Sequence, residues 1–428
     1  MQMDREKAFI IKDGYPYSPV YKDVYFSGDG LAESQNVFVR PHNFARRWQP
    51  GATFHILETG FGTGLNFLTT LALFRQSSSG FLHYFACEAF PLQPEEIRLA
   101  LRHAPELQSL LKELLAVYDP SLPGFHSFSL QGGVTLTLLL GDARQLLPEL
   151  QTIISGARFD AFYLDGFSPD RNPELWNDSI YQELSRLGKR GSTLSTFTVA
   201  GHVRRGLTQA GFQLEKLPAT GRKKEFLFGT LLDPQLRISR SPWYEISTVP
   251  ASKEVAIVGA GLAGCLTARS LADRGFRVTL FDSAGAVASG ASGNPLGIVM
   301  PVLSRKESHF SSLTLQAYLS FLRYFSQHSV FTRGIIQLFY DERSTIRLNE
   351  ALEWLKKAGA GSIAHAVSQQ EIEEWTGVRT NYQGIFFPEA CAVDPVALCR
   401  SQIDHPLIDF RPRTQISNIQ PEATGMIL

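Results

Sequence analysis

The stretch His55-Ile56-Leu57-Glu58-Thr59-Gly60-Phe61-Gly62-Thr63-Gly64-Leu65-Asn66-Phe67-Leu68 places an acid and three alternating glycines between two apolar runs. This pattern predicts a strand, a tight turn and a helix. Glycines adopt backbone angles that side chains forbid, and they let a ligand lie against the main chain, where the free amides of the next helix face it. A phosphate loop needs Lys and Ser or Thr after its last glycine, so Leu65 and Asn66 argue against triphosphate binding.

The acid before the glycines favours a ligand that carries an amino group. S-adenosylmethionine, with its ammonium, carboxylate and ribose hydroxyls, is such a ligand. The residues expected to contact it in this stretch are Glu58, Gly60, Gly62, Gly64 and Asn66. The alternative is a glycine-rich turn that only lets helix and strand pack closely.

Further acids follow the ends of later predicted strands. Phe81–Glu88 predicts a second strand, and Glu88 stands where a doubly wound sheet delivers a carboxylate to ribose hydroxyls. Asp142 follows a third strand, where it contacts the adenine amino group or caps the next helix. Asp165 follows a fourth strand and precedes a proline-broken loop, which makes it the candidate catalytic residue for the acceptor.

Ser192–Phe197 predicts a fifth strand, and residues 212–215 and 225–231 predict a terminal hairpin. Strands and helices thus alternate over about 230 residues, which indicates an α/β fold with an open, mostly parallel sheet and helices on both faces. The aromatic-rich opening forty residues predict an ordered arm, because aromatic side chains at that density need burial. We interpret residues 1–238 as a methyltransferase domain of the Rossmann type.

Composition bounds the remaining possibilities. A chain of 428 residues exceeds what one hydrophobic core usually supports, so we expect two domains. Its 41 Lys and Arg balance its 41 Asp and Glu, so the net charge does not attract nucleic acid. The four cysteines have no spacing typical of a metal or redox site, so we expect buried thiols and no metal. The sequence has neither a signal-peptide core nor an apolar run that would span a bilayer. We expect a cytoplasmic monomer without membrane contact.

The neutral total conceals a basic region between Leu184 and Thr230. Such a region near a catalytic crevice suits RNA, because phosphates dominate affinity, although a solvated helix face is the ordinary explanation of a charge run. Its members are Arg186, Lys189, Arg190, Arg204, Arg205, Lys216, Arg222, Lys223 and Lys224. We expect five of them to contact tRNA: Arg204, Arg205, Arg222, Lys223 and Lys224.

After a Pro- and Ser-rich linker at 239–252, the chain restarts a second Rossmann-type domain at 253–428. A short apolar strand leads into Gly259, Gly261 and Gly264, and Asp282 ends the next strand about 20 residues on, as a ribose-binding acid should. No Arg follows that acid, so NAD or FAD is expected rather than a 2′-phosphate. The small-residue loop 288–301, with Ser292 and Asn294, favours the bulky flavin of FAD.

Several motifs in order resemble the bifunctional tRNA 5-methylaminomethyl-2-thiouridine biosynthesis (MnmC) family. They span roughly residues 15–305 and comprise Asp23–Ser27, Gly60–Leu68, Leu164–Pro169 with Asn172-Pro173, Val203–Leu207, Gly221–Glu225, and Ala291–Pro295 with Met300-Pro301. A methyltransferase followed by a flavin domain is itself unusual, which makes the resemblance specific.

The resemblance implies two steps on the wobble uridine of tRNA. The FAD domain would oxidatively remove the carboxymethyl group from 5-carboxymethylaminomethyl-2-thiouridine, and the first domain would methylate the resulting amine from S-adenosylmethionine. It also implies that Asp165 is the active-site acid, and Phe61 and Phe167 are candidates for stacking on the uracil, although phenylalanines here are more often core.

One departure from the family concerns the glycine-oxidase-like second domain. Family members return near the C-terminus with a Gly-x-Arg segment that completes the FAD site, and this sequence reaches Leu428 without an evident return. We therefore expect an incomplete FAD domain. Two alternatives stay open: a small-molecule amine methyltransferase fused to an amine oxidase, and a methyltransferase whose second domain only positions tRNA.

Overall fold

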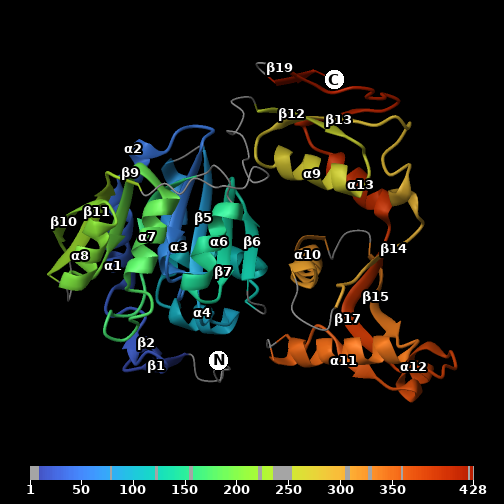
Figure 1. Cartoon of the computed structure of the whole chain (residues 1–428), viewed down its shortest axis with the longest axis horizontal. Coiled ribbons are helices and arrows are strands. Elements are labelled where there is room, and N and C mark those ends of the chain that lie inside the picture. Colours follow the sequence, from blue (N-terminus) through green and yellow to red (C-terminus); the bar gives the residue numbers. More distant parts are fainter. Residues whose placement is uncertain are drawn as a thin grey trace. The chain divides into compact units, whose positions relative to one another are not determined.

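The computed structural model describes residues 9–77, 80–120, 124–153, 158–219, 224–234, 253–303, 309–325, 330–357, 360–422 and 425–427. The chain divides into two compact units, Met1–Val249 and Pro250–Leu428 (Figure 1). The expected linker at 239–252 lies outside the described residues, so its exact bounds stay a prediction.

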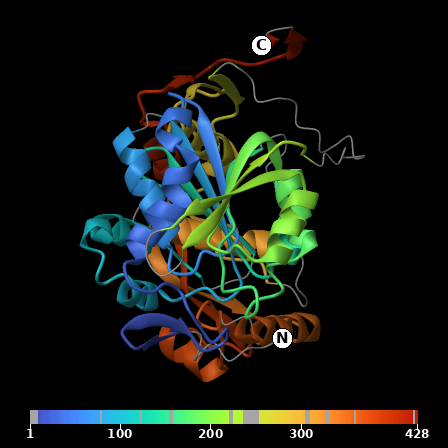
Figure 2. The ribbon, with the colours of Figure 1, turned by 90° about the vertical axis from the view of Figure 1, so that its left-hand side faces the viewer.

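An eight-stranded sheet in the order β10-β11-β9-β8-β4-β5-β7-β6 forms the centre of the first unit. Its strands are β4 (Thr53–Glu58), β5 (Phe81–Glu88), β6 (Gly124–Leu130), β7 (Val134–Leu140), β8 (Phe159–Tyr163), β9 (Gly188–Thr196), β10 (Phe212–Pro218) and β11 (Glu225–Leu231). The five strands from β9 to β7 are parallel, and the predicted β10–β11 hairpin is antiparallel. Figure 2 presents this hairpin edge of the sheet.

The predicted parallel sheet is thus confirmed, with two differences. Strand β9 begins at Gly188, four residues before the predicted Ser192, because its first residues pair irregularly with β8. The edge strand β6, antiparallel to β7, was missed, although its residues alternate between buried and exposed as those of a half-buried strand do.

Consecutive residues of the central strands supply two separate apolar cores. Ile56 and Tyr84 belong to one core, and their neighbours Leu57 and Phe85 belong to the other. Alternate side chains of a strand point to opposite faces, so both faces of this sheet are buried, as a parallel sheet requires. Helices α3 (Leu65–Ser77), α4 (Pro94–Ala100) and α5 (Gln108–Val117) contribute to the first core, and α6 (Ala143–Ile153), α7 (Asp178–Leu187) and α8 (Gly201–Gln209) to the second.

The N-terminal arm is ordered, as predicted. It forms a small sheet of β1 (Ile10–Lys12), β2 (Tyr15–Ser18) and β3 (Asp23–Val24), then α1 (Gly30–Glu33), the π-helix η2 (Ser34–Val39), η3 (Arg40–His42) and α2 (Phe44–Arg47). Val37, Phe38 and Phe44 of the arm are buried in the first core. The arm is therefore an integral part of the first unit.

The second unit contains two main sheets. The fingerprint strands β12 (Glu254–Val258) and β13 (Arg277–Phe281) are parallel to each other and to β18 (Ile408–Arg411), and α9 (Leu262–Ala272) and α13 (Pro395–Ile403) pack beside them. The other sheet is antiparallel and joins β14 (Gly297–Val299), β15 (Val330–Leu338), β16 (His365–Val367) and β17 (Gly384–Val393). The other elements of this unit are η6 (Ala291–Gly293), α10 (His309–Phe325), α11 (Glu342–Lys357), α12 (Gln369–Thr376), β19 (Gln420–Glu422) and β20 (Gly425–Ile427), and the first unit also contains η4 (Pro105–Leu107).

All four cysteines are buried free thiols, as expected. Across the described ranges, no helix combines the length and apolarity needed to cross a bilayer. In the same part of the chain, no group of three or more His, Cys, Asp and Glu side chains is arranged to hold a metal ion.

The packing of α8 against α7 yields a first prediction. A Cβ at Gly206 would lie 2.5 Å from a ring carbon of Tyr181 and 2.8 Å from Oδ1 of Asp178, whereas a Cβ at Gly201 would meet only the end of the Arg205 side chain at 3.3 Å. Gly→Ala normally stabilises a helix by about 1 kcal/mol. We expect Gly206→Ala instead to destabilise the protein by about 1–3 kcal/mol through overpacking, and Gly201→Ala, in the same helix, to be neutral or stabilising. Equal denaturant midpoints for the two variants, followed by tryptophan fluorescence, would contradict this packing.

Candidate functional site

The predicted acids meet at one edge of the sheet. Because β4, β5, β7 and β8 are parallel, their carboxyl ends bring Glu58, Glu88, Asp142 and Asp165 to the same side. Strand β4 lies where the order reverses, with β5 and β7 on one side and β8 and β9 on the other. Ligands of open α/β sheets bind at such a switch point. The glycine turn after β4 is therefore in the position of a ligand site.

The glycine turn has no room for side chains. A Cβ at Gly60 would lie 2.9 Å from the main-chain oxygen of Asp165. Gly62 and Gly64 have φ of +51° and +74°, in the left-handed region that favours glycine. The turn therefore presents bare main chain ahead of α3, which fits the close approach of a ligand such as S-adenosylmethionine.

Glu88 fixes the middle of this turn. One carboxylate oxygen accepts a hydrogen bond from the Gly62 amide at 2.8 Å, and the other accepts one from the Phe90 amide at 2.8 Å. Burial raises the pKa of Glu88, and these backbone donors oppose the rise. Glu88 is half-buried, and its contact with ribose stays a prediction.

Asn66 connects two of the predicted acids. Its Nδ2 donates to Oε1 of Glu58 at 2.8 Å and to Oδ2 of Asp165 at 2.8 Å. Its Oδ1 accepts a hydrogen bond from Oγ of Ser34 at 2.7 Å, and Tyr84 donates to the other oxygen of Glu58 at 2.9 Å. The predicted contacts of Asn66 and Glu58 with a methyl donor stay predictions, whereas these contacts within the protein are observed.

The two carboxyl groups differ in environment. Glu58 has no exposed surface, whereas Asp165 is half-buried. Burial raises the pKa of Glu58 well above its ordinary value, the negative charge of Asp165 raises it further, and the hydrogen bonds from Asn66 and Tyr84 offset part of the rise. Glu58 therefore retains its proton to higher pH than an exposed glutamate does.

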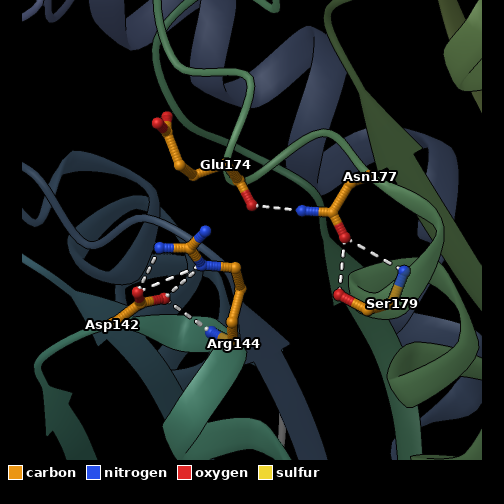
Figure 3. A network of polar contacts seen from close by, with 5 residues as sticks. All are labelled: Asp142, Arg144, Glu174, Asn177 and Ser179. Atoms are coloured by element: carbon orange, nitrogen blue, oxygen red, sulfur yellow. Dashed lines mark hydrogen bonds and ion pairs between the residues drawn. The ribbon is translucent and has the colours of Figure 1, made fainter.

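Asp142 caps the helix that follows it. Its Oδ1 accepts from the Arg144 amide at 2.9 Å, and its Oδ2 lies 2.6 Å from a guanidinium nitrogen of Arg144 (Figure 3). These bonds lower the pKa of Asp142. The capping alternative is thus observed, and the adenine contact stays a prediction.

The loop after β8, which carries Asp165, is tied to the start of α7. Asn177 caps that helix by accepting from the amide and the hydroxyl of Ser179, at 3.0 and 2.6 Å, and its Nδ2 donates to the main-chain oxygen of Glu174 (Figure 3). Trp176 donates from Nε1 to the main-chain oxygen of Phe167 at 2.7 Å. The loop is therefore held by several internal bonds.

Aromatic side chains from the arm pack over this edge. Tyr21 stacks on Phe167 with ring centroids 4.5 Å apart, and it meets Phe90 edge-on at 5.8 Å. Tyr25 contacts Phe167 at 5.0 Å. Phe61 is 3% exposed and belongs to the first core, so the core alternative is the one observed for it. Sequence reasoning missed Tyr21, for which the aromatic richness of the arm was the only signal.

Three cations of the basic region form ion pairs within the protein. Arg186 is buried in an ion pair with Glu183, because α7 turns it inward. Lys189 pairs with Asp160 at 2.5 Å at the amino edge of the sheet, and Lys216 pairs with Glu225 at 2.9 Å. These three cations are therefore engaged within the protein.

The predicted RNA contacts that the structure describes lie toward the crevice edge. Arg204 and Arg205 are exposed on α8, which follows the carboxyl end of β9. Lys224 is exposed just before β11, whose first residue, Glu225, pairs with Pro218 at the end of β10, at the same edge. Arg222 and Lys223 lie outside the described residues.

The second glycine turn is equally crowded. Gly259 has φ of +102°, and a Cβ at Gly264 would lie 1.8 Å from the Gly259 oxygen. Asp282 accepts from the Ala260 amide at 2.7 Å and from the Ala284 amide at 2.8 Å, so it ties the turn to the end of β13. Because a carboxylate offers about four acceptor sites, it retains capacity for a ribose. These residues fit a dinucleotide such as FAD.

The small-residue loop closes on the start of α9. Oγ of Ser292 accepts from the Leu262 amide at 3.1 Å and would lie 3.0 Å from a Cβ at Gly261. Asn294 is exposed and donates to the Ala291 oxygen at 3.2 Å. Ser292 is thus beside the glycine turn, and the FAD contacts of Gly261, Ser292 and Asn294 stay predictions.

A family model matches part of each half of the chain. Residues 105–231 match the family model of S-adenosyl-L-methionine-dependent methyltransferases, and residues 254–425 match that of FAD dependent oxidoreductases. Among solved structures, MNMC2 from Aquifex aeolicus has a TM-score of 0.39 and 24% identity, covering 53% of this chain and 69% of that chain.

Two curated relatives are named tRNA 5-methylaminomethyl-2-thiouridine biosynthesis bifunctional protein MnmC. The one from Ectopseudomonas mendocina is 41% identical over 93% of this chain, and the one from Chromobacterium violaceum is 39% identical over 93%. The chain spans 61% of the length of each. With a methyltransferase-family domain followed by an FAD-dependent oxidoreductase-family domain, this chain resembles the MnmC relatives over most of its own length.

Proposed function

We propose that the first unit transfers a methyl group from S-adenosylmethionine to the primary amine of 5-aminomethyl-2-thiouridine in tRNA. The observation that carries this proposal is the hydrogen-bonded Asp165 carboxylate beside the glycine turn at the switch point of the sheet. The names of the relatives, which are 2-thiouridine biosynthesis proteins, support the substrate class.

The acceptor amine needs a partner of this kind. An alkyl ammonium is mostly protonated at neutral pH and has no lone pair to attack a methyl group. S-adenosylmethionine supplies that methyl group in activated form. The Asp165 carboxylate accepts a hydrogen bond from the ammonium and then its proton, which frees the nitrogen lone pair. The nitrogen attacks the methyl carbon while the bond from that carbon to sulfur breaks, and S-adenosylhomocysteine leaves as a neutral thioether. The glycine turn sets the position of the methyl donor for this displacement.

Asp165→Asn tests this role. The amide keeps the size of the side chain but cannot take a proton, so we expect kcat for methyl transfer to amine-bearing tRNA to fall roughly 10²- to 10⁴-fold. Binding of S-adenosylmethionine, measured by calorimetry, should be retained as the control. Wild-type turnover in the variant would remove Asp165 from the mechanism.

We further propose that Arg204, Arg205 and Lys224 contact tRNA phosphates. They are exposed and lie toward the crevice edge, whereas Arg190, near the start of β9, is exposed at the opposite edge. Phosphate contacts by Lys and Arg supply most of the salt-dependent affinity for nucleic acid.

The double variant Arg204→Gln with Arg205→Gln should raise the KM for tRNA and reduce the slope of log affinity against log salt by about 1 for each phosphate that is no longer neutralised. Arg190→Gln is the matched control, and it should leave both quantities unchanged. An identical salt dependence in the wild-type protein and both variants would exclude α8 from the RNA surface. A salt-independent reaction with a free amine would favour a small-molecule substrate.

For the second unit, we propose removal of the carboxymethyl group from 5-carboxymethylaminomethyl-2-thiouridine. FAD, when bound, supplies the two-electron oxidant. Gly259, Gly261 and Gly264 would let its pyrophosphate approach the main chain, and Asp282 would bind its ribose.

Purified protein incubated with FAD should retain flavin absorbance after gel filtration. Gly264→Val should lose it, because a side chain there collides with the Gly259 oxygen. Gly361→Val is the control, since the nearest atom to its Cβ is 3.7 Å away. A wild-type protein that stays colourless after incubation would refute the FAD proposal without bearing on methyl transfer.

We propose that the protein acts in the cytoplasm, where its tRNA substrate is found, and as a monomer. Light scattering after gel filtration tests the oligomeric state.

A further inference from the structure

Asn66 has a position that a ligand contact does not explain. The two hydrogens of its Nδ2 are directed to two carboxyl groups, Glu58 and Asp165, each at 2.8 Å. Its Oδ1 is occupied by the Ser34 hydroxyl at 2.7 Å. The Asn66 side chain is 7% exposed and Ser34 is 2% exposed. Both polar atoms of the amide are thus engaged inside the protein.

The orientation of the amide is determined by these partners. If the amide were flipped, its oxygen would face two carboxyl groups, and both would lose a donor. In this orientation the Ser34 hydroxyl donates to Oδ1, so all three polar partners of the amide are satisfied. Ser34 begins the π-helix η2 of the arm, so an element outside the sheet controls the amide.

Asp165 is held on both sides as a result. Asn66 donates to its Oδ2, and the Gly166 amide donates to its Oδ1 at 2.9 Å. Its main-chain oxygen accepts from the Thr59 hydroxyl at 2.7 Å. A carboxylate with a fixed donor on each oxygen is restricted in rotation, which is what a group that must aim an amine requires.

We propose that Ser34 and Asn66 are positioning residues for the Asp165 carboxylate, acting as a relay from the N-terminal arm to the acceptor site. This inference rests on the proposed methyl transfer, and it assigns to Asn66 a role different from donor binding. The charged and titratable groups around the relay are Asp165, Glu58, Glu88 and Tyr84.

Ser34→Ala is the first test, because it removes one hydroxyl and touches neither carboxyl group. We expect kcat for methyl transfer to fall about 3- to 10-fold, in line with the loss of one hydrogen bond. The Kd for S-adenosylmethionine and the KM for tRNA should be unchanged. Thr69→Val is the matched control: the Thr69 hydroxyl is as buried but donates to the Leu65 oxygen within α3.

Asn66→Ala is the stronger test. We expect a loss in kcat of roughly 100-fold, because the carboxylate is no longer aimed. The acidic limb of the kcat profile should also move to higher pH, because a carboxylate that loses a donor holds its proton to higher pH. A purely structural role for Asn66 would lower stability without moving this limb.

A titration independent of turnover separates this inference from the proposed function. Infrared difference spectra of protein with ¹³C-labelled aspartate carboxyls, with the Asp165 band assigned through Asp165→Asn, should show its titration moved upward in Asn66→Ala and, to a smaller extent, in Ser34→Ala. If both variants titrate like Thr69→Val, the relay is refuted. If the relay is seen but wild-type protein does not methylate tRNA, the proposed function fails and the positioning role stands.

Discussion

The contact between two parallel strand ends governs the first unit. Strand β4 pairs with β8, and the segments that follow the two strands lie very close together. A Cβ at Gly60 would be 2.9 Å from the Asp165 main-chain oxygen. Only glycine fits there. The same closeness brings the Asp165 side chain within hydrogen-bond reach of Asn66 in the first turn of α3. The bare main chain of the turn and the position of the Asp165 carboxylate therefore both follow from the pairing of β4 with β8.

The electrostatics of the site follow from burial. Glu58 shares the Asn66 amide with Asp165, and burial together with the negative charge of Asp165 raises the pKa of Glu58. Tyr84 and Asn66 satisfy the oxygens of Glu58, so its burial leaves neither oxygen unpaired.

The second unit also has a strand-end acid that is hydrogen-bonded to a glycine turn. Asp282 joins the ends of β12 and β13 by accepting from the amides of Ala260 and Ala284. Gly264 lets α9 approach the turn more closely than a side chain would allow. In both units a strand-end acid holds a glycine turn by accepting hydrogen bonds from its main-chain amides.

Local patterns in the sequence were enough to predict the central strands, both glycine turns and the acids at the strand ends, because period, turn chemistry and strand-end position are properties of short segments. The edge strand β6 and the early start of β9 were not predictable in this way, since edge pairing depends on a partner strand. The inward turn of Arg186, the core position of Phe61 and the stacking of Tyr21 on Phe167 depend on which faces meet after folding. The hydrogen bonds from Ser34 through Asn66 to Glu58 and Asp165 join positions that lie far apart in the sequence. No local signal encodes such a bridge, because it exists only when the arm, the helix and two strand ends are packed together.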